Sequence, residues 1–323
     1  MADDLTSPLR RAALAAGCAL AMSAVAPAGL HQDAPDLLRT LTQDEVLARA
    51  ATYVGRFERS MSTVVLEERY VQIVKPWMLP PREPDEKHLA WFDDPSAVRP
   101  DVIVSQRRQT RSDLLLVQLP DQRWTAFRDT FEVNGREQRR REDRLRKLFL
   151  EQSEDSRRQL RRIHQRSAEF NLGGFYREIN LPTTGLLVAH SRYQQRFAFE
   201  AGNIAQRSPA ACRLVSFNET TTPTLVRSVT ERDVPMRGQL CVAEDGAVWS
   251  TRLDLDPRYT VRGVIDVTYA PHAQAEVLVP ERMWEWYVLP EPDRRGLPAY
   301  VEALATYSNL RKFTVTTSET VKP

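Results

Sequence analysis

Residues 261–269 read VRGVIDVTY, and the alternation in this stretch decides the fold class. The odd-numbered positions from Gly263 to Tyr269 are apolar or glycine, whereas Asp266 and Thr268 between them are polar. A period of two is typical of a β-strand with one buried face, because successive side chains point to opposite sides of the sheet. One face of the sheet is therefore predicted to be shielded from water.

Short segments rich in β-branched and aromatic residues continue on both sides of this strand. Turn signals such as Asn134-Gly135 and Glu244-Asp245-Gly246 separate some of them. Strands that follow one another at hairpin spacing pair antiparallel, because a parallel pair needs a long crossover connection. The further strands are predicted at residues 61–74, 102–106, 113–119, 124–133, 197–200, 213–218, 225–229, 239–242, 248–255, 276–279, 283–289, 303–308 and 312–317.

Two segments are predicted to be helical. Residues 44–59 carry one apolar face, and Thr42 with Glu45 forms a capping box at the start of this helix. Residues 135–190 read as a helical insertion, which includes a short helix at residues 183–190. The predicted class is α+β: a strongly curved antiparallel β-sheet, as a half-barrel or open barrel, with an N-terminal helix and an inserted helical segment.

The N-terminal residues predict export. Arg10 and Arg11 precede an apolar stretch at residues 12–26, and Ala26-Pro27-Ala28 matches a cleavage site. Residues 1–28 are thus predicted to be a signal peptide, and residues 29–323 a single periplasmic or secreted domain without an integral membrane span. A buried alanine-rich helix is the alternative for the apolar stretch.

Cys212 and Cys241 remain after this cleavage, and two cysteines in an exported chain suggest a disulfide. The predicted strand at residues 225–229 argues against it, because it places the cysteines on the first and third strands of a meander. Such strands lie about 9–10 Å apart, whereas a disulfide needs Cα atoms within about 7 Å. The two cysteines are therefore predicted not to be bonded.

The order of a helix, a strand and a long antiparallel meander resembles the superfamily of periplasmic lipoprotein-localisation factors. This resemblance implies a half-barrel that is closed by helices and binds acyl chains inside. Residues 124–151 (WTAFRDTFEVNGREQRRREDRLRKLFLE), 279–290 (VPERMWEWYVLP) and 305–315 (ATYSNLRKFTV) are also similar to a group of uncharacterised secreted bacterial proteins. The second resemblance implies no known activity.

An apolar groove on the curved sheet is the predicted ligand site. The helix at residues 44–59 covers only part of a sheet with this many strands, and uncovered apolar area of this kind marks binding sites. Trp284 and Trp286 share a strand face, and packing into an ordinary core is the alternative for these aromatic residues. The candidate groove residues are Trp249, Ile265, Val267, Tyr269, Met283, Trp284, Trp286 and Tyr287.

Residues 136–166 hold twelve Lys and Arg residues against six Asp and Glu residues. The pattern favours a solvated helix pair held by ion pairs between residues four apart. The functional alternative is a face that docks on an anionic envelope surface, such as phospholipid headgroups. The candidate patch residues are Arg139, Arg140, Arg144, Lys147, Arg158, Arg161 and Arg162.

The sequence signals no catalytic residue, metal site or cofactor. None of the five histidines has metal-ligand spacing, and no nucleophile elbow, P-loop or dinucleotide fingerprint is present. The near-neutral charge, 45 Lys+Arg against 43 Asp+Glu, gives no general attraction to nucleic acid.

The predicted function is non-catalytic binding of a lipid, an acyl chain or a lipoprotein in the envelope. The alternatives are an interaction scaffold whose core is filled by its own side chains, and a secreted hydrolase with an unrecognised site. Cavity volume separates the first two hypotheses, and a buried cluster of ionisable groups with shifted pKa values favours the third.

Overall fold

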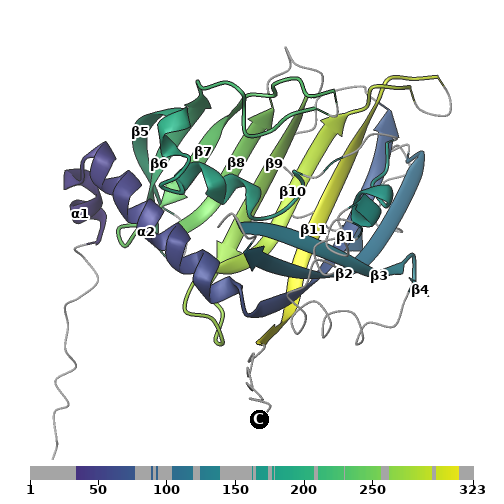
Figure 1. The fold of residues 1–323 in the computed structure, drawn as a ribbon, viewed down its shortest axis with the longest axis horizontal. Coiled ribbons are helices and arrows are strands. Elements are labelled where there is room, and N and C mark those ends of the chain that lie inside the picture. The colour runs from purple at the N-terminus through teal and green to yellow at the C-terminus, as the bar shows by residue number, and fades with distance from the viewer. Residues whose placement is uncertain are drawn as a thin grey trace, which may run out of the picture.

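A curved antiparallel sheet dominates the fold (Figure 1). The computed structural model describes residues 34–76, 89, 92–93, 104–118, 124–138, 162, 165–173, 177, 179–206, 210–228, 230–255, 262–292 and 296–312. The strands are β1 (Val64–Pro76), β2 (Gln106–Gln118), β3 (Trp124–Val133), β4 (Arg136–Glu137), β5 (Phe197–Gln206), β6 (Ala211–Glu219), β7 (Met236–Val242), β8 (Val248–Leu255), β9 (Gly263–Ala270), β10 (Val279–Val288) and β11 (Ala299–Lys312). They form an 11-stranded sheet in the order β4-β3-β2-β1-β11-β10-β9-β8-β7-β6-β5.

The sheet is open, because β4 and β5 lie at its two ends and do not pair with each other. Neighbouring strands pair antiparallel throughout this order. The predicted α+β class, with a curved unclosed sheet and an N-terminal helix, is confirmed. Residues 1–33, which include the predicted signal peptide, lie outside the described residues.

Four named helices lie on the concave side of the sheet (Figure 1): α1 (Ala34–Thr40), α2 (Gln43–Met61) and the 3₁₀ helices η2 (Thr184–Ala189) and η3 (Gln194–Arg196). The capping box at the start of α2 is confirmed: Thr42 Oγ1 accepts from the Glu45 amide at 3.3 Å, and the Glu45 carboxylate accepts from the Thr42 amide at 2.7 Å. Helix α2 crosses in front of the strands (Figure 1), and its buried face packs into the main core.

The two faces of the sheet have separate cores, and β1 contributes to both. Leu66 and Tyr70 on one face belong to the main core together with α2. Val71 and Ile73 on the other face join a smaller cluster that contains the fully buried Phe92. Strand β1 is therefore buried on both sides.

Some strands are longer than predicted. The strand predicted at 113–119 is part of β2, which begins at Gln106, because its charged residues have partners on neighbouring strands; of the strand predicted at 102–106, the described residues 104 and 105 are not in a strand. Arg111, for example, forms ion pairs with Glu67 on β1 and, at 3.0 Å, with Glu132 on β3. In the same way β10 and β11 begin before the strands predicted at 283–289 and 303–308.

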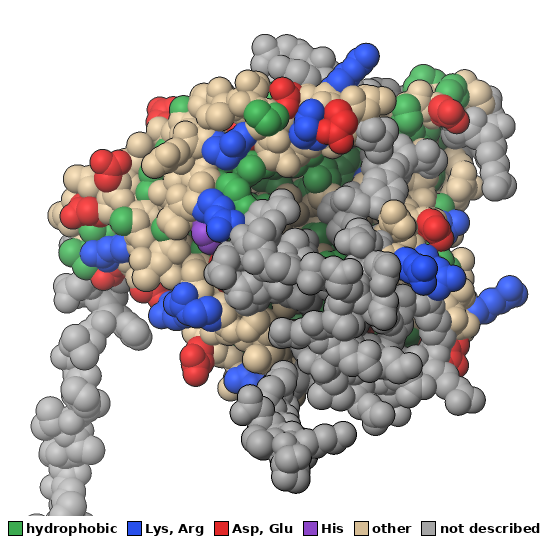
Figure 2. Space-filling model, viewed as in Figure 1, with side chains coloured by type: hydrophobic (Ala, Val, Ile, Leu, Met, Phe, Trp, Pro, Cys, Tyr) green, Lys and Arg blue, Asp and Glu red, His purple; other side chains and the backbone are tan. Residues whose placement is uncertain are grey.

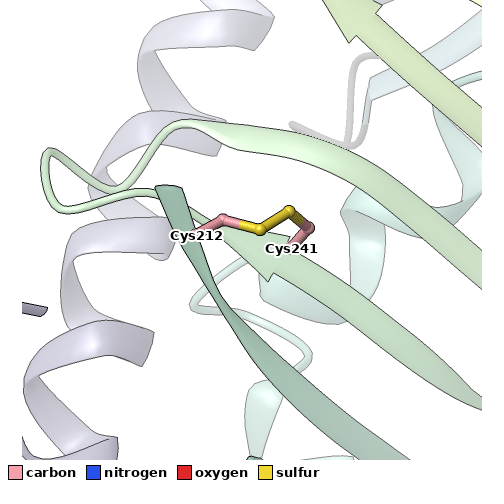
Figure 3. Close-up of a disulfide and its surroundings, with 2 residues drawn as sticks. All are labelled: Cys212 and Cys241. Atoms are coloured by element: carbon pink, nitrogen blue, oxygen red, sulfur yellow. A yellow bond between two sulfur atoms is a disulfide. The ribbon is translucent and has the colours of Figure 1, made fainter. Parts of the chain in front are cut away.

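The prediction of unpaired cysteines is wrong, since Cys212 and Cys241 form a disulfide with Cα atoms 5.3 Å apart (Figure 3). Residues 225–228 of the strand predicted at 225–229 form a loop with one isolated bridge, from Arg227 to Asp233. Strand β6 therefore pairs directly with β7, and Leu214 lies opposite Cys241. The cysteines are on adjacent strands, within reach of a disulfide.

The predicted insertion at residues 135–190 begins differently from expectation. Asn134 and Gly135 form the predicted turn, with positive φ angles of 48° and 76°, but the short strand β4 follows it instead of a helix. The predicted helix at residues 183–190 is present as η2. Residues 139–161 lie outside the part of the chain that the structure describes.

Candidate functional site

The inner face of β1–β3 changes from apolar to polar along the strands. Leu66, Leu114 and Ala126 belong to the main core under α2. The next inner positions on the same strands are Glu68, Ser112 and Arg128, all buried. Because alternate residues of a strand share a face, an apolar and a polar region adjoin on one concave surface.

The apolar region contains a small hollow beneath the C-terminal end of α2. Its free volume is about 10 Å³, which is room for about one water molecule. Hydrophobic side chains are visible in the hollowed part of this face in Figure 2. The lining residues are Phe57, Met61, Leu66, Leu114, Leu115, Leu116, Ala126, Thr183 and Pro280.

The polar region is built on a buried ion pair. Glu68 is fully buried and accepts hydrogen bonds from two nitrogens of Arg128, whose side chain is 4% exposed. Arg128 Nη2 also donates to the carbonyl oxygen of Asn180 at 2.7 Å. The charge of each partner is thus compensated inside the protein, as burial of an ion pair requires.

A second buried carboxylate, Glu285, lies between two tyrosines. It accepts hydrogen bonds from the hydroxyls of Tyr70 and, at 2.8 Å, Tyr287. Burial, and then the nearby charge of Glu285, raises the pKa of both tyrosines well above the usual value. The tyrosines therefore stay protonated and act as donors. Asn180 Nδ2 donates in turn to Tyr70 Oη at 3.2 Å.

These polar residues hold a covering segment against the sheet, defined by the described residues 170–173, 177 and 179–182. Gln72 on β1 donates to the Phe170 carbonyl at 2.9 Å and accepts from the Leu172 amide at 2.8 Å. Arg177 within the segment donates to Gln72 and packs over the Tyr287 ring at 4.9 Å. The polar region is therefore closed by the chain itself.

The candidate groove residues divide between the two faces. Trp284 and Trp286 share a face as predicted, but that face is the convex one, where Trp284 Nε1 donates to Glu302 at 2.8 Å. Trp249 packs at the margin of the main core. The residues that lie in the main core, on the concave face, are Ile265, Val267, Tyr269, Met283 and Tyr287.

Sequence reasoning missed the inner residues of β1–β3. Residues 113–117 read DLLLV, so the inward Leu114 and Leu116 are hidden in a continuous apolar run. Glu285 carried a signal, because it is an acid between two tryptophans in an otherwise apolar strand.

The predicted basic patch is outside the described residues except for Arg162, which is exposed. Within the described part of the chain, no group of three or more His, Cys, Asp or Glu side chains is placed to hold a metal ion. None of the helices described there is long and apolar enough to cross a membrane.

No protein-family model matches the chain, and no curated protein matches it. Among solved structures, it is similar to a Vibrio parahaemolyticus domain described as that of an outer membrane lipoprotein-sorting protein, with 7% identity over 84% of this chain and 95% of that chain, and a TM-score of 0.31. A DUF1329 family protein from Desulfovibrio piger has 7% identity over the same shares and a TM-score of 0.30. A lipovitellin structure has 8% identity over 80% of this chain and 26% of that chain, with a TM-score of 0.25. At these identities and TM-scores, the neighbours' functions are not transferred to this chain.

Proposed function

We propose that the chain is an exported, non-catalytic envelope protein that binds an apolar or amphipathic ligand on the concave side of its sheet. The ligand classes are a lipid, an acyl chain or an acylated lipoprotein. The apolar concave face of the sheet beneath α2 is the observation that carries this proposal, because ligand sites are concave and mostly apolar.

Entry of an acyl chain requires movement, since the hollow has room for about one water molecule. Phe57 and Met61 on the last turns of α2 form one wall of the hollow. A shift of these turns away from β2 and β3 enlarges the hollow without breaking strand pairing. Helix α2 is therefore the proposed movable cover.

An interaction scaffold is the second candidate function, and the small volume of the hollow favours it. In this alternative, α2 and the covering segment fill the concave side permanently. The two functions differ in whether the last turns of α2 leave the sheet.

The hydrolase hypothesis gains one feature, the buried cluster around Glu68 and Glu285. Both carboxylates accept hydrogen bonds from buried side chains of the protein. Arg128 and Gln72 also donate hydrogen bonds to backbone carbonyl oxygens of the covering segment. We therefore propose that this cluster anchors the covering segment and does not act on a substrate.

The test is a titration of the full chain with a dansyl-labelled fatty acid, followed by fluorescence. Met61→Ala removes part of the wall and is expected to raise the affinity for the probe about threefold to tenfold, because it leaves space beside the sheet. Met236→Ala is the matched control, since Met236 is also buried but lies on β7 and does not line the hollow.

The proposal is supported if the wild type binds the probe and if Met61→Ala, but not Met236→Ala, binds it more tightly than the wild type does. Equal gains in both variants would mean that the probe enters any loosened core. If neither the wild type nor folded Met61→Ala takes up the probe, the ligand-binding function is wrong and the scaffold replaces it.

A further inference from the structure

Two arginines on the convex face of the sheet converge on one backbone oxygen. Arg69 lies two residues before Val71 on β1, and Arg107 lies on β2. Because Val71 and Ile73 belong to the smaller apolar cluster and Arg107 pairs opposite Ile73, both arginines share the convex face. Arg69 Nη2 donates to the carbonyl oxygen of Phe92 at 2.9 Å, and Arg107 Nη2 donates to the same oxygen at 3.1 Å. The two guanidinium groups are therefore neighbours.

The negative charge beside these cations comes from one exposed acid. Asp93 forms an ion pair with Arg69 at 2.8 Å, and the Asp93 side chain is 68% exposed. Gln109 Oε1 accepts a further hydrogen bond from Arg69 at 3.3 Å but brings no charge. Among the described residues, no carboxylate forms an ion pair with Arg107. Two cations thus share one anion.

The surroundings of Arg107 show the effect of this imbalance. Its Nε atom is buried and has no hydrogen-bond partner in the described part of the chain. Burial, and then the charge of Arg69, lowers the pKa of Arg107. A guanidinium nevertheless stays charged at neutral pH. The imbalance is therefore relieved by an added anion and not by loss of a proton.

We propose that Arg69 and Arg107 form a binding site for a phosphate group on the convex face of the sheet. Displacement of Asp93 frees Arg69 Nη1, and Arg107 Nη1 has no hydrogen-bond partner among the described residues. A phosphate has enough oxygens to accept hydrogen bonds from both guanidinium groups at once, and arginine suits this geometry. The site lies on the opposite face from the proposed ligand site and does not depend on it.

Anchoring of Phe92 is the alternative role of the two arginines. Phe92 is fully buried in the smaller apolar cluster, where its carbonyl oxygen has two lone pairs to satisfy. The two roles differ in the part that Asp93 takes. In a pure anchor Asp93 only neutralises Arg69, whereas in a phosphate site it competes with the ligand.

Isothermal titration calorimetry of the full chain with inorganic phosphate tests the site. Arg107→Gln is expected to weaken binding about tenfold, because a cation and a charge-assisted hydrogen bond are lost. Asp93→Asn is expected to tighten binding about threefold, since the competing carboxylate is gone. Arg252→Gln is the matched control and is expected to bind like the wild type, because Arg252 is a partly exposed arginine of the same face that pairs with Asp254 and Asp266.

Vesicles of phosphatidic acid, compared with vesicles of phosphatidylcholine, identify the source of the phosphate group. A lipid headgroup is supported if phosphatidic acid vesicles bind the wild type and Arg107→Gln weakens that binding. A free phosphate compound is supported if inorganic phosphate alone shows this dependence.

The phosphate site is overturned if the wild type binds neither inorganic phosphate nor the vesicles. It is also overturned if Arg107→Gln, shown to be folded by circular dichroism, binds like the wild type. Failure of Asp93→Asn to tighten binding would leave the arginines as an anchor for Phe92 and would equally overturn the site. None of these results bears on fatty acid uptake on the concave side, which is measured separately.

Discussion

At the scale of single residues, buried polar side chains hold the covering segment on the sheet. Glu68 and Arg128 are both nearly inaccessible to solvent, and Arg128 also binds the Asn180 carbonyl. A buried ion pair of this kind contributes little net stability, but loss of one partner is costly because a charge is left without compensation.

Arg128→Leu is expected to lower the free energy of unfolding by about 3–5 kcal/mol, because Glu68 then stays buried without its partner. The double variant Glu68→Leu/Arg128→Leu is expected to recover about 2 kcal/mol or more of that loss. Urea unfolding of the two variants measures the difference. A double variant that is less stable than Arg128→Leu would show that the cost does not come from the isolated charge.

At the scale of elements, the sequence predicts those whose signal is local. The capping box of α2, the strand at residues 248–255 and the alternation of β9 all match the structure, since each depends on neighbours within a few residues. The described residues 225–228 of the strand predicted at 225–229 form a loop, because β propensity does not specify whether a segment finds a partner. That one error also produced the wrong cysteine pairing.

The disulfide between Cys212 and Cys241 is expected to stabilise the folded protein. The bond links residues 29 apart in sequence, so Cys212→Ser/Cys241→Ser is expected to lower the free energy of unfolding by about 2–4 kcal/mol, through a less constrained unfolded chain. Urea unfolding measures the change, and non-reducing peptide mapping of the wild type checks the bond itself. Recovery of two unlinked cysteine peptides would contradict the direct pairing of β6 with β7.

Across the whole molecule, the sequence predicts which residues share a face but not which face is concave. Alternation placed Ile265, Val267 and Tyr269 together, and they do share the concave core. The same reasoning placed Trp284 and Trp286 on one face, which is correct, but the sheet curves so that this face is the convex one. The sense of curvature depends on contacts among all the strands, so no local pattern contains it.

The central claim is that the concave side takes up an apolar or amphipathic ligand, and native mass spectrometry of the protein isolated from its own cells tests it most directly. The account predicts a species heavier than the polypeptide by the mass of one lipid or acylated molecule, which is lost on collisional activation. Only the ligand-free mass, in protein that also fails to bind the fatty acid probe, would contradict the account.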